Sequence, residues 1–207
     1  MHARDRERLA DAFRFALDAH ADQRRKASDV PYVSHLLQVA GLVLEHGGDA
    51  KLASAGLLHD ALEDCADVDL EVLRERFGGE VALVVERCTD LLPGDRPDAK
   101  SSWSLRKQSY LARLREADAR TRLVAVCDKL HNLRSLVSDL RAEGKETLSR
   151  FNAKPEQMRW YYESVRTWLC DGLPARLVDE LDDLLDALRE FVPSKEADAS
   201  RPTRSEA

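Results

Sequence analysis

The sequence predicts an all-α fold. Apolar residues recur every three to four positions along most of the chain, which is the period of one buried helix face. No stretch shows the strict alternation of a half-buried strand. The 207 residues are enough for one domain with a full core. The longest apolar series contains Leu123, Val126, Leu130, Leu133, Val137 and Leu140.

Capping and helix-breaking residues set the boundaries of the first three helices. A first amphipathic helix is predicted up to about His20, followed by a polar, basic loop over 23–29. Pro31 disfavours helix just before it, and Ser34 is expected to cap a second helix that ends at the glycine pair 47–48. Asp49 is then expected to cap the third helix.

The rest of the chain continues the helical pattern up to a polar tail. Residues 92–102 contain prolines and a glycine and are expected to form a loop. We expect residues 1–192 to form one domain, with a core over about 8–170 and a C-terminal helix over 174–191. The polar residues 193–207 are expected to be disordered. The remaining helices are predicted over 69–77, 80–91, 103–115, 119–140 and 155–169.

Composition excludes several classes of function. The chain has 32 basic and 38 acidic residues and a net charge of -6, which argues against general binding of nucleic acid. A local basic cluster can still bind a small anionic molecule. The four cysteines form no CxxC pair and indicate reduced thiols in a cytoplasmic protein. No long apolar run or secretory signal indicates a membrane partner or export, and the oligomeric state stays open.

Four ionisable residues stand close together at the end of the third predicted helix. On a continuous helix, His59 and Glu63 share one face, while Asp60 and Asp64 share the next. Burying three carboxylates and an imidazole is costly unless a cation or hydrogen bonds compensate. The pattern therefore indicates a divalent metal site; the alternative is a solvated, acidic helix end.

Two further polar residues on other helices are candidates for the same site. His35 lies in the first turn of the second helix, where a lone histidine is also typical of a cap or a surface group. Asp128 lies one step from the long apolar stripe, and Asn132 follows one turn later. The alternative for Asp128 and Asn132, taken alone, is a structural hydrogen-bond network.

The combined order H…HD…D resembles that of the HD-domain metal-dependent phosphohydrolases. The surrounding motifs, over roughly 8–169, look like the hydrolase domain of the RelA/SpoT family, and the best match is the stand-alone small alarmone hydrolases. The synthetase and regulatory domains of long family members have no counterpart. The resemblance implies an HD-domain helical bundle with appended C-terminal helices. The motifs that carry it are Arg25-Lys26, Pro31-Tyr32-Val33-Ser34-His35, His59-Asp60-Ala61-Leu62-Glu63-Asp64 and Asp128-Lys129-Leu130-His131-Asn132-Leu133-Arg134.

The resemblance implies an activity and a set of site residues. The activity is Mn²⁺-dependent hydrolysis of the 3′-pyrophosphate of guanosine alarmones, (p)ppGpp, to GDP or GTP and pyrophosphate. Two imidazoles and two carboxylates suit Mn²⁺ or another divalent ion. The acidic pair Glu63 and Asp64 would position and activate the attacking water. The implied metal ligands are His35, His59, Asp60 and Asp128, and the implied nucleotide-binding residues are Arg25, Lys26, Asn132 and Ser135.

Other interpretations keep the same metal site. The substrate could instead be another nucleotide, as in an NADPH or nucleotide phosphatase or a phosphodiesterase. A non-catalytic nucleotide-binding regulator is a further alternative, although it has no evident use for Glu63 and Asp64. The basic residues around Arg25 could also serve only solubility.

The chain departs from the family pattern in two segments. Residues 27–30 lack the glycine common before the Pro-Tyr pair, and residues 100–107 are unlike the long family members. Either Tyr161 or Tyr162 could reach a nucleotide, but core packing is the simpler interpretation for both.

Overall fold

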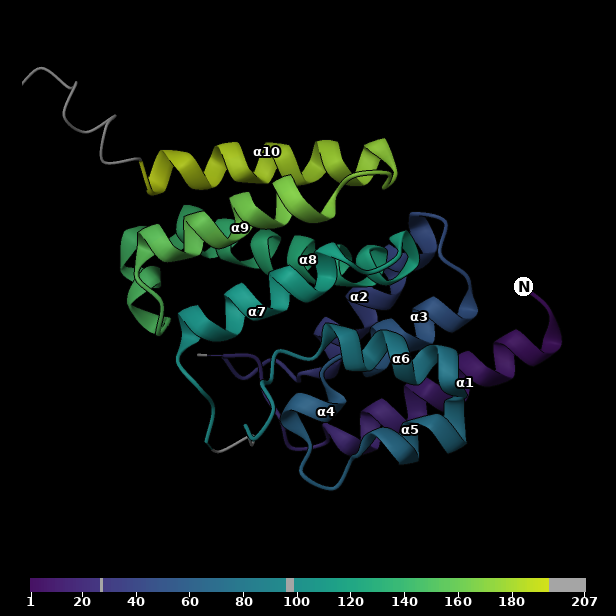
Figure 1. Ribbon diagram of the computed structural model, residues 1–207. Helices are drawn as coiled ribbons and strands as arrows, with labels where there is room; N and C mark the ends of the chain where they lie inside the picture. The colour runs from purple at the N-terminus through teal and green to yellow at the C-terminus, as the bar shows by residue number, and fades with distance from the viewer. Residues whose placement is uncertain (27, 96–98, 194–207) are drawn as a thin grey trace, which may run out of the picture.

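A computed structural model describes residues 1–26, 28–95 and 99–193 (Figure 1). Within these ranges the chain forms helices and no strand, which confirms the all-α prediction. The predicted disorder of the tail falls on 194–207 and thus outside the described residues. The helices are α1 (Ala3–Ala19), α2 (Val33–Glu45), α3 (Ala50–Leu58), α4 (Ala61–Asp64), α5 (Leu70–Phe77), α6 (Gly79–Cys88), α7 (Trp103–Arg115), α8 (Ala119–Glu143), the 3₁₀ helix η1 (Lys145–Arg150), α9 (Pro155–Leu169) and α10 (Ala175–Phe191).

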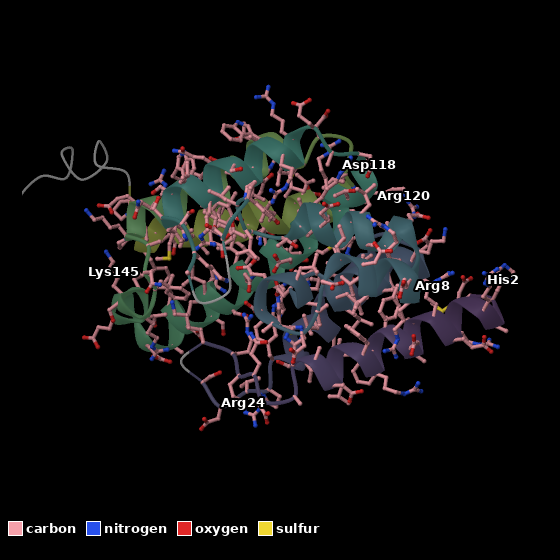
Figure 2. All side chains as sticks on the ribbon, turned by 60° about the horizontal axis from the view of Figure 1, so that its bottom comes forward. His2, Arg8, Arg24, Asp118, Arg120 and Lys145 are labelled. Atoms are coloured by element: carbon pink, nitrogen blue, oxygen red, sulfur yellow. The ribbon has the colours of Figure 1, made fainter. Side chains whose placement is uncertain are left out.

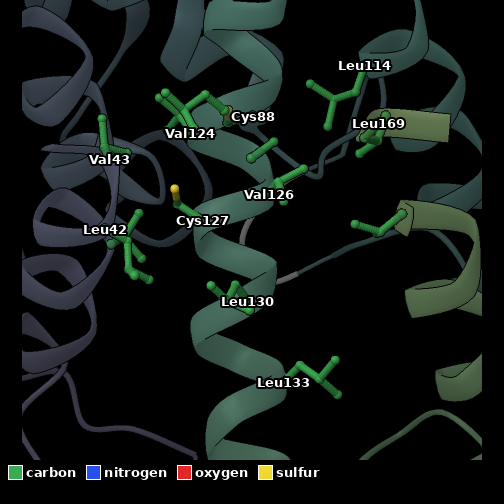
Figure 3. Close-up of a cluster of buried hydrophobic side chains, with 14 of the residues drawn as sticks. Leu42, Val43, Cys88, Leu114, Val124, Val126, Cys127, Leu130, Leu133 and Leu169 are labelled. Carbon is green, nitrogen blue, oxygen red and sulfur yellow. The ribbon is translucent and has the colours of Figure 1, made fainter. Parts of the chain in front are cut away.

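Helix α8 runs through the centre of the molecule. It packs against α2, α3 and α6 on one side and against α9 and α10 on the other. Figure 3 shows Leu42 and Val43 of α2 on one flank of α8, and Leu114 and Leu169 on the other. Because α8 is buried on nearly all sides, the polar side chains that it carries have a fixed orientation. The fully buried residues of α8 include Val124, Val126, Cys127, Leu130 and Leu133.

Most predicted helix boundaries agree with the structure, because the capping residues act as expected. Asp49 accepts hydrogen bonds from two backbone amides at the start of α3, and Asp69 accepts one at the start of α5. Helix α2 begins at Val33, so Ser34 is not its cap. Helix α6 ends at Cys88 rather than near Leu91, and α8 continues three residues past Leu140.

The acidic motif does not lie on one continuous helix, contrary to our expectation. Helix α3 ends at Leu58, and the short helix α4 begins at Ala61. His59 and Asp60 form the junction, and Asp60 has φ −98° and ψ −1°, off the helical values. The bend directs Glu63 and Asp64 differently from the faces that an unbroken helix would give them.

A hairpin-like turn shapes the basic loop between α1 and α2. The backbone amide of Arg25 donates to the carbonyl of Val30 at 2.8 Å, and that of Tyr32 donates to the carbonyl of Gln23 at 3.0 Å. These bonds hold Arg25 and Tyr32 beside each other. Figure 2 shows the loop, marked by Arg24, at the C-terminal end of α1, away from His2 and Arg8.

Two expectations from composition can be compared with the structure. All four cysteines are free thiols: Cys65 is half-buried, and the other three are buried in the core. Figure 3 shows Cys88 and Cys127 among the apolar side chains. Among the described helices, none combines the length and the apolar character needed to cross a membrane.

Candidate metal centre and nucleotide cavity

Four side chains from three parts of the chain meet beside the middle of α8. His35 comes from the first turn of α2, His59 and Asp60 from the α3–α4 junction, and Asp128 from α8. His35 Nε2 lies 3.2 Å from Asp128 Oδ1 and 3.6 Å from Asp60 Oδ2. His59 Nε2 lies 2.9 Å from Asp60 Oδ2 and 3.6 Å from Asp128 Oδ1. One ligand atom from each of His35, His59 and Asp128 falls within 4.8 Å of the other two.

Neighbouring groups orient each member of this cluster. His59 Nδ1 lies 2.9 Å from the carbonyl oxygen of Gly56, so a proton on Nδ1 leaves Nε2 facing the other ligands. Tyr32 Oη donates to Asp60 Oδ2 at 2.6 Å. His35 Nδ1 lies 2.7 Å from Nδ1 of His131, which is consistent with donation from His35 to a neutral His131.

Asp128 is held by two residues of its own helix. Asn132 Nδ2 donates to Asp128 Oδ1 at 2.6 Å, and the ammonium of Lys129 contacts Oδ2. Burial opposes the charged form of Asp128, but Lys129 and His59 outweigh it and hold the pKa of this carboxyl well below its ordinary value. Asp128 is therefore an anion beneath the protein surface.

The donor set fits a divalent cation. His59 Nε2 is buried and forms no hydrogen bond within the described residues, despite its proximity to Asp60. Burial disfavours protonation of His59, yet Asp60 and Asp128 outweigh it and raise the pKa of the imidazole well above its ordinary value. A cation would satisfy Nε2 and balance the two carboxylates in place of that proton. The nitrogen and oxygen donors suit a borderline-hard divalent metal.

The acidic pair lies next to this cluster and faces a lysine. Lys100 Nζ lies 2.9 Å from Glu63 Oε1 and 3.7 Å from Asp64 Oδ1. Glu63 Oε2 accepts from the backbone amide of Asp90 at 3.1 Å, and Asp64 Oδ2 accepts from Gln23 Nε2 at 2.8 Å. Burial and the negative charge of Asp60 raise the pKa of Asp64 above its ordinary value. Asp64 is thus a stronger base than an exposed aspartate.

A cavity of about 830 Å³ opens above the cluster. The four predicted ligands lie beneath its floor, while Tyr32, His131 and Asn132, which contact them, line it. Seven basic side chains line the cavity against four acidic ones, so its charge is opposite to that of the whole chain. The basic residues are Arg25, Lys26, Lys100, Arg106, Lys107, Lys129 and Arg150.

The four predicted nucleotide-binding residues all line this cavity. Arg25 Nη2 donates to Asn132 Oδ1 at 3.0 Å, and its guanidinium carbon lies 5.8 Å from the centre of the Tyr32 ring. Lys26 Nζ lies 5.2 Å from the centre of the Phe151 ring. Ser135 follows Asn132 by three residues on α8, which places both on one helix face. Arg25 and Asn132 therefore link the outer part of the cavity to the candidate metal-binding side chains His35, His59, Asp60 and Asp128, which together are called the metal cluster.

Comparison with known proteins agrees with this geometry. Residues 12–153 match the HD domain family, which is more than half of the chain. The chain belongs to the HD domain family. The family predicted from the motifs is thereby confirmed.

Two relatives of this HD-domain chain are named for the same reaction. It is 39% identical over 129 residues to a probable guanosine-3′,5′-bis(diphosphate) 3′-pyrophosphohydrolase of Synechocystis, covering 62% of the chain and 16% of that protein. It is 34% identical over 131 residues to the guanosine-3′,5′-bis(diphosphate) 3′-pyrophosphohydrolase MESH1 of Xenopus tropicalis, covering 62% of the chain and 69% of that protein. The chain spans only 14 to 18% of the length of several other relatives, which are named as GTP pyrophosphokinases, a GTP diphosphokinase or a pyrophosphohydrolase.

A solved structure extends the likeness to the whole fold. It is that of a metazoan ortholog of SpoT, described as hydrolysing ppGpp, and it shares 26% sequence identity with this chain. The TM-score is 0.69, with 86% of this chain and 94% of that chain covered. The HD-domain helical bundle predicted from the sequence is confirmed by this match.

Sequence reasoning missed several residues of this HD-domain site. Asp90 is buried and accepts from Arg106 Nη1 at 2.6 Å and from Lys107 Nζ at 2.7 Å. It lies just after α6 but inside the predicted helix over 80–91, where no spacing singles out its carboxylate. The family motifs contain His131 and Tyr32, but the resemblance implies no role for either. Either could have been found from its position, since Tyr32 lies three residues before His35 and His131 three residues after Asp128.

Tyr161 and Tyr162 both line the cavity. The sequence leaves open which of them reaches a nucleotide, and both have access to the cavity. Tyr161 is buried, and its hydroxyl makes no hydrogen bond within the described part of the chain. Lys107 Nζ lies 4.9 Å from the centre of the Tyr161 ring. Tyr161 therefore both packs in the core and lines the cavity.

Proposed function

We propose that this chain hydrolyses the 3′-pyrophosphate of (p)ppGpp and releases pyrophosphate with GDP or GTP. The observation that carries the proposal is the pairing of two features in one cavity. The His/Asp cluster lies beneath the cavity floor, and Arg25, hydrogen-bonded to Asn132, lines the same cavity. The names of the relatives support guanosine-3′,5′-bis(diphosphate) as the substrate.

His35, His59, Asp60 and Asp128 would hold the cation, for which we propose Mn²⁺. When bound, such a cation supplies a Lewis acid that polarises a phosphate oxygen and makes an attacking water more acidic. Asn132 and Tyr32 keep the two carboxylates in place through the hydrogen bonds described above. Lys129 adds a positive charge at Asp128 Oδ2, whereas the two imidazoles lie near Oδ1.

Glu63 and Asp64 would orient the attacking water and accept its proton. The pKa of Asp64 is raised by burial and by the charge of Asp60, and a carboxylate made more basic in this way suits general-base catalysis near neutral pH. Water would attack the phosphorus attached to the ribose 3′ oxygen. The bond from that phosphorus to the 3′ oxygen would break, the 3′ oxygen would take up the proton released from the water and become a hydroxyl, and pyrophosphate would leave the site.

Basic residues of the cavity wall would bind the phosphates. Burial and the nearby ammonium of Lys129 lower the pKa of Lys107, which indicates that positive charges are crowded here. Asp90 neutralises part of that charge by pairing with Lys107 and Arg106. An anionic substrate would relieve the remaining repulsion. Phosphate groups thus suit this wall better than a neutral substrate does.

Arg25 would stack on the purine base. Its bond to Asn132 and its position over Tyr32 restrict the guanidinium, so that a planar face is presented to the cavity. Lys26, which lies over Phe151, and Ser135 on the α8 face would border the same base.

Product analysis tests the proposal. Purified protein with Mn²⁺ is incubated with ppGpp, ppApp, NADPH, dNTPs and cyclic nucleotides, and the products are separated by ion-exchange chromatography. We expect ppGpp to yield GDP and pyrophosphate in equal amounts. Release of single phosphates from ppGpp, or turnover of NADPH or a cyclic nucleotide without turnover of ppGpp, would overturn the proposal.

A further inference from the structure

A line of polar side chains runs along α8 from the metal cluster into the cavity. Asp128, Asn132, Ser135 and Asp139 follow one another at spacings of four, three and four residues, which keeps them on one helix face. Asn132, Ser135 and Asp139 all line the cavity, with Asp128 beneath it. Asp139 therefore lies one turn beyond Ser135, farther from the metal cluster than the residues assigned to the base.

The carboxylate of Asp139 is half-buried and has no protein partner among the described residues. Its side chain takes part in no hydrogen bond or ion pair there, and only its backbone carbonyl accepts a bond, from Thr147 Oγ1 at 3.4 Å. Glu143, one turn farther along α8, is instead paired with Arg150. The carboxylate oxygens are therefore free to accept hydrogen bonds from a ligand in the cavity.

We propose that Asp139 recognises the guanine base and rejects adenine. The inference rests on the proposed function, because it requires the base to lie against Arg25, Asn132 and Ser135. Guanine carries two adjacent donors on one edge, N1–H and the exocyclic N2–H, and the two oxygens of a carboxylate can accept both. Adenine presents the lone pair of N1 at the corresponding position, which a carboxylate repels.

The order of residues along α8 is consistent with this geometry. A base that stacks on Arg25 is held beside Asn132, because Arg25 and Asn132 are hydrogen-bonded. Its ribose and 3′ phosphates would extend toward the metal cluster at Asp128. The opposite edge of the base would then point along the helix toward Asp139. The sequence alone did not decide between guanine and adenine, and Asp139 supplies the group that would.

Binding of nucleoside diphosphates tests the inference without turnover. The affinities of GDP, ADP and XDP, the xanthine analogue, are measured by calorimetry for the wild type and for Asp139→Asn. Xanthine has a carbonyl where guanine has its amino group. The asparagine amide offers one acceptor and one donor, which match N1–H and that carbonyl.

We expect the wild type to bind GDP more tightly than XDP or ADP. Asp139→Asn should weaken GDP binding by about 10- to 150-fold, the range for losing a hydrogen bond to a charged group, and should bind XDP at least as tightly as GDP. Asp179→Asn is the control, since it removes one exposed carboxylate on α10, remote from the cavity lining. It should leave all three affinities unchanged.

The outcomes separate this inference from the proposed function. Equal losses for GDP, ADP and XDP in Asp139→Asn, or no change in any of them, would overturn the role of Asp139 in base recognition. If the relative affinities shift as expected but ppGpp is not hydrolysed, the inference stands and the proposed reaction fails. If ppGpp is hydrolysed but the relative affinities do not shift, the reaction stands and the inference fails.

Discussion

Removal of one hydroxyl group should destabilise the metal cluster. Tyr32→Phe deletes the donor to Asp60 Oδ2, at 2.6 Å, and keeps the ring that packs against His20 and His35. Burial and the charge of Asp60 raise the pKa of Tyr32, so the hydroxyl stays protonated and remains a donor across the accessible pH range. A hydrogen bond to a charged group contributes about 1.5–3 kcal/mol, so the free energy of unfolding of the metal-free protein should fall by about that amount.

The measurement is urea denaturation of the metal-free protein, with Tyr110→Phe as the matched control. The Tyr110 hydroxyl is also buried but has no hydrogen-bond partner within the described residues, so its removal should be nearly neutral or slightly stabilising. A metal titration should also show about 10- to 100-fold weaker binding in Tyr32→Phe, as expected when a group that orients a ligand is lost. If Tyr32→Phe is no less stable than Tyr110→Phe and binds metal normally, Tyr32 does not support Asp60.

Three further predictions concern the metal, the water and the base. His59→Ala and Asp128→Ala should each abolish bound metal and turnover while the helical circular dichroism persists; unchanged metal content by elemental analysis in both would contradict the ligand assignment. Glu63→Gln and Asp64→Asn should each lower kcat by about 10²–10⁴-fold without loss of nucleotide affinity. Because the pKa of Asp64 is raised, wild-type kcat/KM should fall on acidification at a higher pH than an ordinary aspartate would give. The pH profile of Asp64→Asn should lack this fall. Arg25→Ala should raise KM for ppGpp, with a loss of about 5- to 150-fold in kcat/KM, but should spare a small phosphomonoester that lacks a base; equal losses on both would exclude base stacking.

The helices were predictable because their signals are local. Pro155 and Trp103 begin α9 and α7 where expected, and Asp49 and Asp69 cap the helices that they precede. The break between Leu58 and Ala61 was not predictable from periodicity, since the apolar spacing continues to Leu62. Asp60 is directed by its contacts with Tyr32, His35 and the adjacent His59, and the first two of these partners come from a distant part of the chain.

The resemblance to the family predicts the four members of the metal cluster. The contacts that support them are seen only in the folded structure. Lys100 faces Glu63 from 37 positions away, across two helices and a loop. Asp90 lies within the range predicted as the helix over 80–91, and nothing in that pattern indicates that it pairs with two cations of α7. Ion pairs between distant segments depend on how helices cross, and a single sequence does not encode that crossing in any local pattern.

The long helix α8 has a consequence for how this protein can change during evolution. One uninterrupted helix carries Asp128 and, farther along, the cavity-lining Ser135 and Asp139. Each residue adds about 1.5 Å and turns the helix by about 100°, so inserting or deleting one residue between Asp128 and Ser135 would swing every later side chain away from the cavity. Point substitutions at the outer positions leave Asp128 untouched. New preferences for the base should therefore arise by exchange of side chains at fixed length, and variants with an insertion or a deletion between Asp128 and Ser135 should have lost the activity.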